Sequence, residues 1–400
     1  MKLHYHHTQK ACYTGYITQA IVNNLAPLLF LTFQTQFSIS LEKISLLISI
    51  NFIMQMIVDI LAAKFVDKIG YRLCVVTAHI CCTIGLIGLG IFPYIFPDSY
   101  AGLVTAILIN AIGGGLIEVL ISPILESLPG DEKAASMSLL HSFYCWGHVG
   151  VVILSTLFFK AAGIQNWYIL ACLWALIPLC NTFFFAKVPL HTVVNQESSL
   201  PVRKLFSMKI FWMFLILMIC SGASEQAMSQ WASMFAESGL KVSKTLGDLL
   251  GPCSFAIFMG ISRVFYGKFG SRINLERFIA GSSLLCIASY LIATLSPYPL
   301  LSLAGCSLCG LSVGIMWPGT FSLSCKYCPQ GGTAMFALLA LGGDIGCGGG
   351  PGLVGIISNA ADGNLKTGLM YALVFPVCMV LIIWLLHSTK KTIGYNIESD

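Results

Sequence analysis

A glutamate stands inside an apolar stretch of the chain, NAIGGGLIEVLISPILE at residues 110–126. At helical spacing, Glu118 shares one face with Asn110, Gly114 and Ser122, each four residues from the next. Small residues at this spacing are typical of close helix packing, but packing does not explain a carboxylate in an apolar helix. We therefore expect Glu118 to line a cavity, where it carries a proton or accepts hydrogen bonds from a polar solute.

A second carboxylate, Glu225, lies in the segment GASEQAMSQWASMFAES, residues 222–238. Serines one turn to either side share its face, while Gln226, Gln230 and Trp231 lie close by. Carboxylate and amide groups bind hydroxyls, and an aromatic ring can cover the CH face of a sugar. The pattern predicts a site for a polyhydroxylated ligand. The alternative is that Glu225 lies at the outer, partly hydrated end of its helix.

Two further segments carry ionisable groups that could move protons. In LLHSFYCWGHVG, His141 and His148 fall on one face, and an imidazole can relay protons near neutral pH. Pairing of each histidine with a neighbouring helix explains the same spacing, so both interpretations stand. Asp344 lies in the run LGGDIGCGGGPG, where the glycines are typical of close packing and the acid is expected to face a cavity.

Uncharged polar residues complete the set of candidate solute ligands. Gln19, Asn23 and Asn24 lie in the first apolar segment, and Asn110 lies in the fourth; all can donate and accept hydrogen bonds. Trp317, in GIMWPG, forms either a cavity wall or a lipid-facing ring. We expect amide groups from several segments to surround one small polar solute.

The composition places these groups in a membrane protein. The 400 residues are 56% hydrophobic and only 10% charged, with a mean hydropathy of +0.83. Soluble domains carry about 25% charged residues. The net charge of +5 comes from basic residues dispersed at segment ends, which fits membrane topology and predicts no nucleic-acid binding. The lipid bilayer is therefore the first expected partner.

Enzymatic and cofactor motifs find little support in the sequence. The chain has no HExxH pattern, and no Lys-Ser or Lys-Thr follows its glycine run as in a phosphate loop. Most of the 16 cysteines lie in apolar runs, and Cys325 and Cys328 have no second pair to complete a zinc site. We expect no enzymatic activity, no metal and no cofactor, so an ion gradient or the solute gradient must supply the energy.

Twelve apolar segments are long enough to cross a bilayer, which needs about 20 helical residues. They lie near residues 12–37, 44–66, 72–96, 100–126, 134–160, 166–186, 208–236, 245–269, 276–296, 299–325, 333–358 and 367–388. One long polar break divides them into two groups of six. We predict an all-α membrane protein with a six-helix bundle at 1–186, a cytoplasmic central loop at 187–207 and a second six-helix bundle at 208–400.

Charge and repetition describe how the segments are arranged. With both termini in the cytoplasm, 17 of the 22 lysines and arginines fall on the cytoplasmic side, which predicts this orientation in the cell membrane. FVDKIGYR at 65–72 recurs as FYGKFGSR at 265–272, and residues 115–123 are echoed at 310–318. Parallel six-helix repeats are a known plan of transporters, with the solute site at the midplane between the halves.

The segment AKFVDKIGYR resembles the motif that the major facilitator superfamily carries between its second and third helices. The matching residues, with their second copy, are Asp67, Lys68, Gly70, Arg72, Lys268, Gly270 and Arg272. The resemblance implies two pseudo-symmetric six-helix bundles and alternating access. It also implies a gate on the cytoplasmic side, in which Gly70 makes a tight turn and Asp67 pairs with cations to latch neighbouring helices.

Two stretches are similar to the fucose:proton symporter branch of that superfamily, GGGLIEVLISPIL in the fourth segment and IVNNLAP in the first. The branch has a glutamate at the position of Glu118 and a His-x-x-Tyr segment like that of His141 to Tyr144, which favours His141 as the proton-relaying histidine. Tyr144 is also among the expected solute ligands. Where the branch has an aspartate in its first helix, this chain has Pro27. The resemblance implies proton coupling through Glu118, with Glu225 as the expected substitute for the missing aspartate.

Together these features predict a monomeric secondary transporter. It is expected to move a small polar solute, a sugar or sugar derivative, by proton symport through alternating access. The expected coupling residues are Glu118, Glu225, His141 and Asp344. A drug or metabolite:proton antiporter is the first alternative, which the amide-rich segments disfavour. A transporter-like receptor, which would bind solute without uptake, is the second.

Overall fold

The computed structural model describes the chain except for residues 1–3, 130–132, 191–199, 201, 329 and 394–400. Its described part is helical, and no strand occurs in it. A bilayer core offers no hydrogen bonds to the backbone, and an α-helix satisfies its own N–H and C=O groups. Long apolar segments therefore fold as helices.

The first bundle contains one helix, or a pair of consecutive helices, at each of the first six predicted segments. Its helices are α1 (Tyr5–Leu28), α2 (Phe30–Gln36), α3 (Leu41–Ile69), α4 (Tyr71–Ile95), α5 (Ser99–Ser127), α6 (Lys133–Ala162), α7 (Trp167–Trp174) and α8 (Leu176–Lys187), with a 3-10 turn, η1 (Ile164–Asn166), before α7. A short helix, α9 (Val202–Ser207), lies within the predicted central loop.

The second bundle follows the same pattern with more interrupted helices. It contains α10 (Lys209–Ser229), α11 (Ala232–Met234), η2 (Phe235–Gly239), α12 (Lys244–Asp248), η3 (Leu249–Cys253), α13 (Ser254–Phe269), η4 (Gly270–Arg272), α14 (Leu275–Leu295), α15 (Pro299–Val313), α16 (Met316–Tyr327), α17 (Gly332–Ala360), α18 (Leu365–Tyr371) and α19 (Val374–Ile393). The segments η2 and η3 have π-helical hydrogen bonding.

Ten helical stretches in the described residues are long and apolar enough to cross a membrane. The pair α1 and α2 adds another span, bent by 44°. The remaining predicted segment is α3, which is 29 residues long and whose described apolar part runs over Leu46–Ala62. The structure confirms the predicted class, an all-α membrane protein with twelve spans in two bundles.

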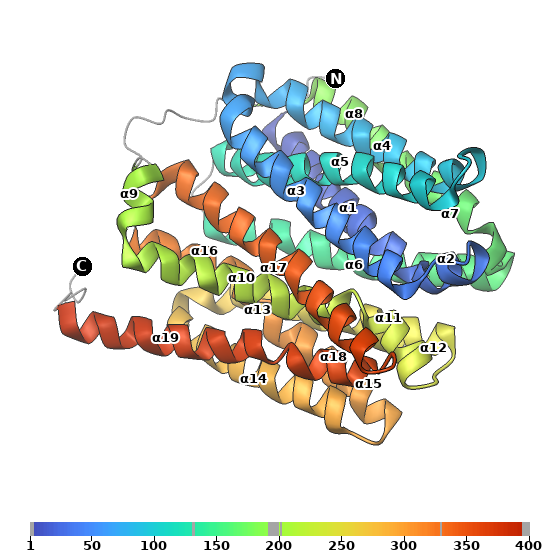
Figure 1. The fold of residues 1–400 in the computed structure, drawn as a ribbon. Helices are drawn as coiled ribbons and strands as arrows, with labels where there is room; N and C mark the ends of the chain where they lie inside the picture. Colours follow the sequence, from blue (N-terminus) through green and yellow to red (C-terminus); the bar gives the residue numbers. More distant parts are fainter. Residues whose placement is uncertain (1–3, 130–132, 191–199, 201, 329, 394–400) are drawn as a thin grey trace.

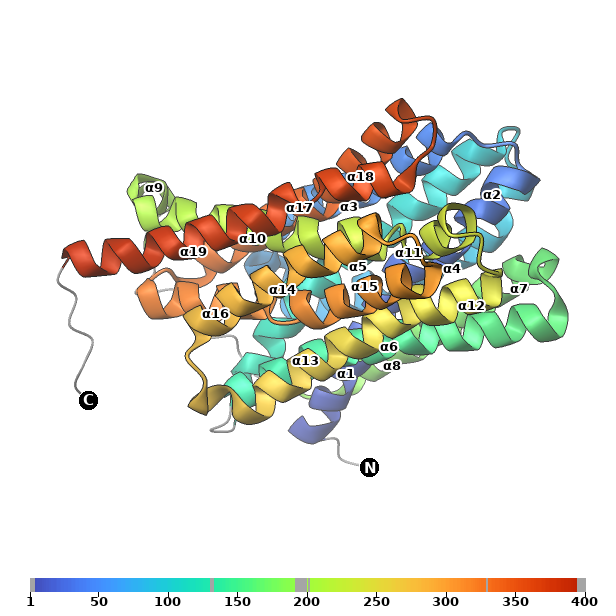
Figure 2. The same ribbon diagram turned by 90° about the horizontal axis from the view of Figure 1, so that it is seen from below.

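The two bundles lie side by side, with the blue-to-teal helices in the upper part of Figure 1 and the orange-to-red helices in the lower part. The most extensive contacts between them are two helix pairs: α3 packs on α17, and α6 packs on α13, as the turned view in Figure 2 also shows. We call these contacts the α3–α17 seam and the α6–α13 seam. Glycines permit close approach in both, because Gly348 faces Phe52 and Gly260 faces Cys145.

The connection between α3 and α4 is a tight turn at Gly70. This residue has φ +99°, in the left-handed region that favours glycine. It is the C-cap of α3 and the N-cap of α4. Its counterpart Gly270 has φ −59° and begins the 3-10 turn η4, so the repeated motif does not repeat the turn. Residues 270–274 separate α13 from α14, and this longer connection needs no left-handed residue.

Gly346 sets the closest approach of α17 to α10, because a Cβ there would collide with the carbonyl oxygen of Ile219. We expect Gly346→Ala to lower the free energy of unfolding by about 1–3 kcal/mol, since the α10 backbone must move away. Gly349→Ala on the same helix is the control, because nothing lies within 4 Å of its Cβ position. That change should be neutral or stabilising by up to about 1 kcal/mol. Melting temperatures in detergent measure both effects, and equal shifts would contradict this packing.

Candidate functional site

Glu118 on α5 lies against α1 at the centre of the first bundle. The Gln19 Nε2 atom donates a hydrogen bond to Glu118 Oε2 over 3.2 Å, and the hydroxyls of Tyr16 and Ser122 are 2.9 Å apart one turn along. The ring of His141 packs edge-on against the Tyr16 ring at 5.0 Å. Gln19 is buried, and Glu118 is half-buried.

We call the polar side chains between α1 and α5 around Glu118 the polar layer. Further polar residues of α1 extend this layer toward α3 and α6. The Gln55 side chain on α3 donates to Asn23 Oδ1 over 3.1 Å, and Asn24 Nδ2 donates to the Tyr144 hydroxyl on α6 over 3.3 Å. Gln55 was not among the solute ligands expected from the sequence. An amide inside an apolar segment is the signal that pointed to Asn23, and it would have found Gln55 as well.

The second bundle contributes a buried ion pair. Arg263 Nη2 on α13 is 3.3 Å from Glu225 Oε2 on α10, and the two side chains are only 5% and 9% exposed. Gln226 donates to Glu225 at 3.4 Å, and Gln230 donates to Gln226 at 2.9 Å. The guanidinium also donates from Nη1 to the His141 carbonyl on α6 at 3.2 Å, so it joins the two bundles.

The position of Arg263 corrects the charge count made from the sequence. That count placed Arg263 among cations on the cytoplasmic side, whereas the structure buries it in the centre beside Glu225. The burial has a physical reason, because a carboxylate in a water-poor interior needs a cation or hydrogen-bond donors close to it. A basic residue near a predicted helix end does not by itself show whether it faces water or a buried acid.

Asp344 on α17 faces a carboxyl group that was not among the residues expected from the sequence. Its partner is Asp59 on α3; each residue is 2% exposed, and the two carboxyl groups lie close enough to interact across the α3–α17 seam. Asp59 interrupts the apolar segment 44–66 as Glu118 interrupts its own segment. The same sequence signal was therefore present for both residues.

The two tryptophans selected from the sequence pack between helices. The indole of Trp231 is fully buried and donates to the Pro351 carbonyl on α17 over 3.0 Å. Trp317 is half-buried on α16 and covers Gly343 of α17, where a Cβ would meet its ring. In this conformation the Trp231 ring offers no face to a solute, and Trp317 supports the wall formed by α17.

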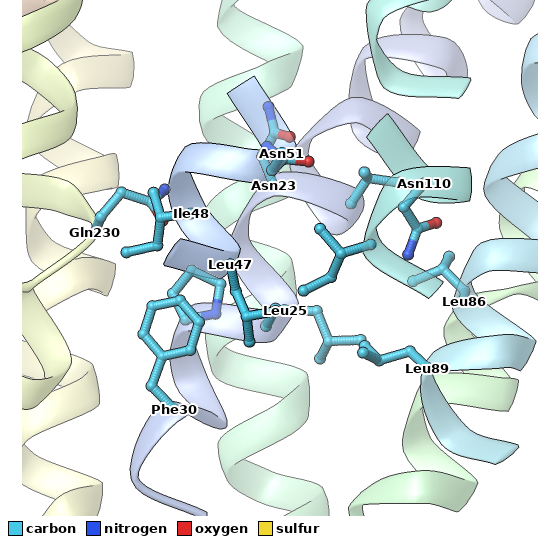
Figure 3. A pocket seen from close by; sticks show the side chains of 14 residues that line it. Asn23, Leu25, Phe30, Leu47, Ile48, Asn51, Leu86, Leu89, Asn110 and Gln230 are labelled. Carbon is cyan, nitrogen blue, oxygen red and sulfur yellow. The ribbon is translucent and has the colours of Figure 1, made fainter. Parts of the chain in front are cut away.

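A cavity of about 30 Å³ lies between α1, α3, α4 and α5, and Gln230, the residue after α10, reaches its wall. Figure 3 shows the amide side chains of Asn23, Asn51, Asn110 and Gln230 among its apolar lining. This volume holds one or two water molecules and no sugar. A sugar can enter only after the helices around the cavity move apart.

Three buried amide oxygens near this layer accept no hydrogen bond from the described protein groups. They are Oε1 of Gln19, Oε1 of Gln55 and Oδ1 of Asn110. Gln19 presents its amide nitrogen to Glu118 and has its oxygen left over, so a protonated Glu118 or a ligand hydroxyl could donate to it. The layer therefore offers acceptors for O–H donors.

Arg72, in the motif between α3 and α4, caps the C-terminus of the neighbouring helix α8. Its guanidinium donates three hydrogen bonds, each 2.9 Å long, to the carbonyls of Phe185, Ala186 and Val188. These carbonyls belong to the last turn of α8 and the residue after it, which have no partner within the helix. In this conformation Arg72 therefore joins α4 to α8 inside the first bundle.

The other residues of the motif lie at exposed helix ends. Lys68 and Arg272 are exposed, and the Lys268 ammonium lies 5.5 Å from the centre of the Phe269 ring. The side chain of Asp67 lies outside the described part of the structure. The latch expected from Asp67 therefore stays a prediction.

Metal binding and hydrolytic chemistry gain no support from the described residues. No group of three or more His, Cys, Asp or Glu side chains among them is placed to hold a metal ion. Residues 310–314, GLSVG, match the GxSxG pattern, but Ser312 is fully buried inside α15 and donates to the Cys309 carbonyl over 2.6 Å. A nucleophile elbow needs an exposed serine on a strand-to-helix turn, so Ser312 serves helix packing.

The two bundles, their two seams and the polar layer between them define a membrane transporter rather than an enzyme. Such proteins expose a central site to one side of the membrane and then to the other by movement of one bundle against its partner. The chain belongs to the Major Facilitator Superfamily, whose profile matches residues 12–351.

Solved structures with the same fold include a variant of the E. coli fucose:proton symporter. It has 17% sequence identity and a TM-score of 0.69, and the alignment covers 94% of this chain and 98% of that chain. A second structure of the same symporter, in the outward conformation, has 16% sequence identity and a TM-score of 0.69 with the same coverage. A D-xylose-proton symporter has 13% sequence identity and a TM-score of 0.74, with 95% of each chain covered. No curated protein matches the sequence.

Proposed function

We propose that this chain is a proton-coupled symporter of a polyhydroxylated solute, a sugar or sugar derivative. The observation that carries this proposal is a set of three buried amide oxygens, on Gln19, Gln55 and Asn110, that accept no hydrogen bond from the described residues. Sugar hydroxyls donate to such oxygens, whereas a hydrophobic cation offers them no donor. Two of the similar structures are named as sugar:proton symporters, which supports the same solute class.

Glu118 is the proposed proton carrier of this cycle. Ionised, it accepts the hydrogen bond from Gln19; protonated, it is neutral and can donate to the free Gln19 oxygen. Proton uptake therefore changes the hydrogen bonds available to a solute beside α1. His141, whose ring packs edge-on against the Tyr16 ring, is the second proposed proton-exchanging group of this region.

The Arg263–Glu225 pair is the proposed contribution of the second bundle. Arg263 reaches α6 of the first bundle, and the glutamines beside Glu225 extend to the cavity wall at Gln230. A solute held between Gln230 and the amides of α1 would contact both bundles. Its binding would then favour the conformation in which the bundles are close together.

The solute class is tested by thermal unfolding of the purified protein with sugars, polyols, amino acids and lipophilic cations. We expect a sugar to raise the melting temperature, because a ligand at 100 times its Kd stabilises the folded state by about 2.7 kcal/mol. The stabilising sugar is then offered to proteoliposomes with an inward proton gradient, and uptake should stop when a protonophore is added.

Two results would contradict the proposal and identify its alternatives. Stabilisation by lipophilic cations alone, with extrusion against a proton gradient, would identify a drug:proton antiporter. Stabilisation by a sugar that is never taken up would identify a solute receptor. Both termini are proposed to face the cytoplasm, as the distribution of lysine and arginine predicts.

A further inference from the structure

The α3–α17 seam contains two carboxyl groups that face each other. Its contacts run in opposite chain directions along the two helices: Ser49 lies near Gly352, Phe52 lies against Gly348, and Asp59 meets Asp344. Each contact joins the first bundle to the second. The aspartates therefore lie on a boundary that must change when the bundles move.

Among the described residues, three of the four oxygens of this carboxyl pair have no hydrogen-bond donor. Both Asp59 oxygens and Asp344 Oδ2 are buried without a hydrogen bond from an N–H or O–H group of the described residues. Two ionised carboxylates have only acceptor atoms, so contact between them is repulsive. The contact becomes a hydrogen bond when one of the two groups carries a proton, as in other water-poor carboxyl pairs.

The groups around the pair increase the negative potential. Helix α5 brings Glu118 near both aspartates, and Cys347 lies near Asp344 on α17 itself. Helix α10 brings Glu225, whose charge is offset by Arg263. The basic residues of α4, α9, α16 and α18 lie at helix ends or in contact with backbone carbonyls; they are Arg72, Arg203, Lys204, Lys326 and Lys366.

We propose that Asp59 and Asp344 share one proton when the α3–α17 seam is closed, and that release of this proton separates the two helices. The pair is a proton-binding site separate from Glu118, and it joins the two bundles. The shared proton is favoured over a metal ion because the described residues bring no third acidic, histidine or cysteine ligand into a metal-binding group with the pair. The inference extends the proposed proton coupling, but it does not depend on the nature of the solute.

The direction of the pH effect follows from linkage. The closed seam binds one proton more than the open seam, so rising pH favours opening. At pH values above the one at which the pair loses its shared proton, the ratio of open to closed seam should increase about tenfold for each pH unit. Below it, the seam stays closed and its backbone amides exchange slowly.

Hydrogen exchange of the full chain in lipid nanodiscs, without solute, tests this directly. Peptides of α3 and α17 are compared at acidic and alkaline pH after correction for intrinsic exchange, with α4 and α8 as internal reference. We expect the seam peptides alone to lose protection at alkaline pH. Asp59→Asn should remove this response, because its amide donates to Asp344 without a proton. Asp98→Asn, at the exposed N-cap of α5, is the matched control and should keep it.

Several outcomes would overturn the proposal. These are a seam without pH response, an unchanged response in Asp59→Asn, or restoration of protection by sodium at alkaline pH, which would identify a cation site. Infrared spectroscopy of the unmodified protein gives a second measurement, since a carboxylic acid C=O band should disappear on alkalinisation together with protection. If the band and the protection change at different pH values, the pair is not the switch. A Glu118→Gln protein should retain the seam response, so failure of the proposed solute coupling is distinguishable from failure of this inference.

Discussion

Replacement of Glu118 by Gln is expected to abolish solute accumulation driven by a proton gradient while leaving solute exchange in place. The amide can still hydrogen-bond with Gln19, so the polar layer keeps its contacts, but it cannot bind or release a proton. If one proton moves with each solute, the unmodified protein can accumulate solute about tenfold per pH unit of gradient. The variant should reach only the outside concentration.

Proteoliposomes loaded with the stabilising sugar measure both activities of the Glu118 variant. Driven uptake is followed after a pH jump, and exchange is followed as counterflow without a gradient. Glu237→Gln is the matched control, because Glu237 is a glutamate that pairs with Lys244 in a partly exposed part of η2. It should transport normally. Driven uptake that survives in Glu118→Gln would show that another group carries the proton.

Loss of Arg263 is expected to produce the largest loss of stability of any single replacement considered for this protein. Arg263→Met removes the cation 3.3 Å from the Glu225 carboxylate and leaves a buried acid without its partner. Breaking a buried ion pair from one side costs about 3–5 kcal/mol, because the remaining charge cannot be solvated. The hydrogen bond to the His141 carbonyl is lost as well, which weakens the α6–α13 seam.

A double-mutant cycle separates the ion pair from simple packing. Glu225→Gln added to Arg263→Met should recover most of the lost stability, since no charge is then left buried. The exposed Arg272→Met, in the same part of the chain, is the control and should change stability by less than about 0.5 kcal/mol. Melting temperatures in one detergent compare the unmodified protein, the Arg263→Met and Glu225→Gln single variants, the double variant and the control. Additive losses in the double variant would rule out the pairing of Arg263 with Glu225.

Local signals in the sequence were sufficient for the helices. Apolar length and the polar break located all twelve spans, because a helix in lipid satisfies its own backbone and needs no distant partner. The turn at Gly70 was also predictable, since the next helix begins at once after it. Gly270 was not, because its conformation depends on the longer connection that follows it.

Single polar residues in apolar segments were visible in the sequence, but their partners were not. Glu118 was recognised from its own segment, and Asp59 and Gln55 gave the same signal without being selected. The contacts Glu118–Gln19 and Glu225–Arg263 join residues far apart in the chain. Small rotations of a helix about its axis decide which side chains meet, and hydrophobic periodicity defines those rotations only coarsely.

The sequence alone therefore determined the class of protein, the number of spans and the presence of acids at membrane depth. The tertiary structure alone decided that one acid pairs with a buried arginine and that two others face each other across a seam. The physical reason is that the two properties depend on interactions over different distances along the chain. Span formation depends on the segment itself, whereas the state of a buried charge depends on every helix packed around it.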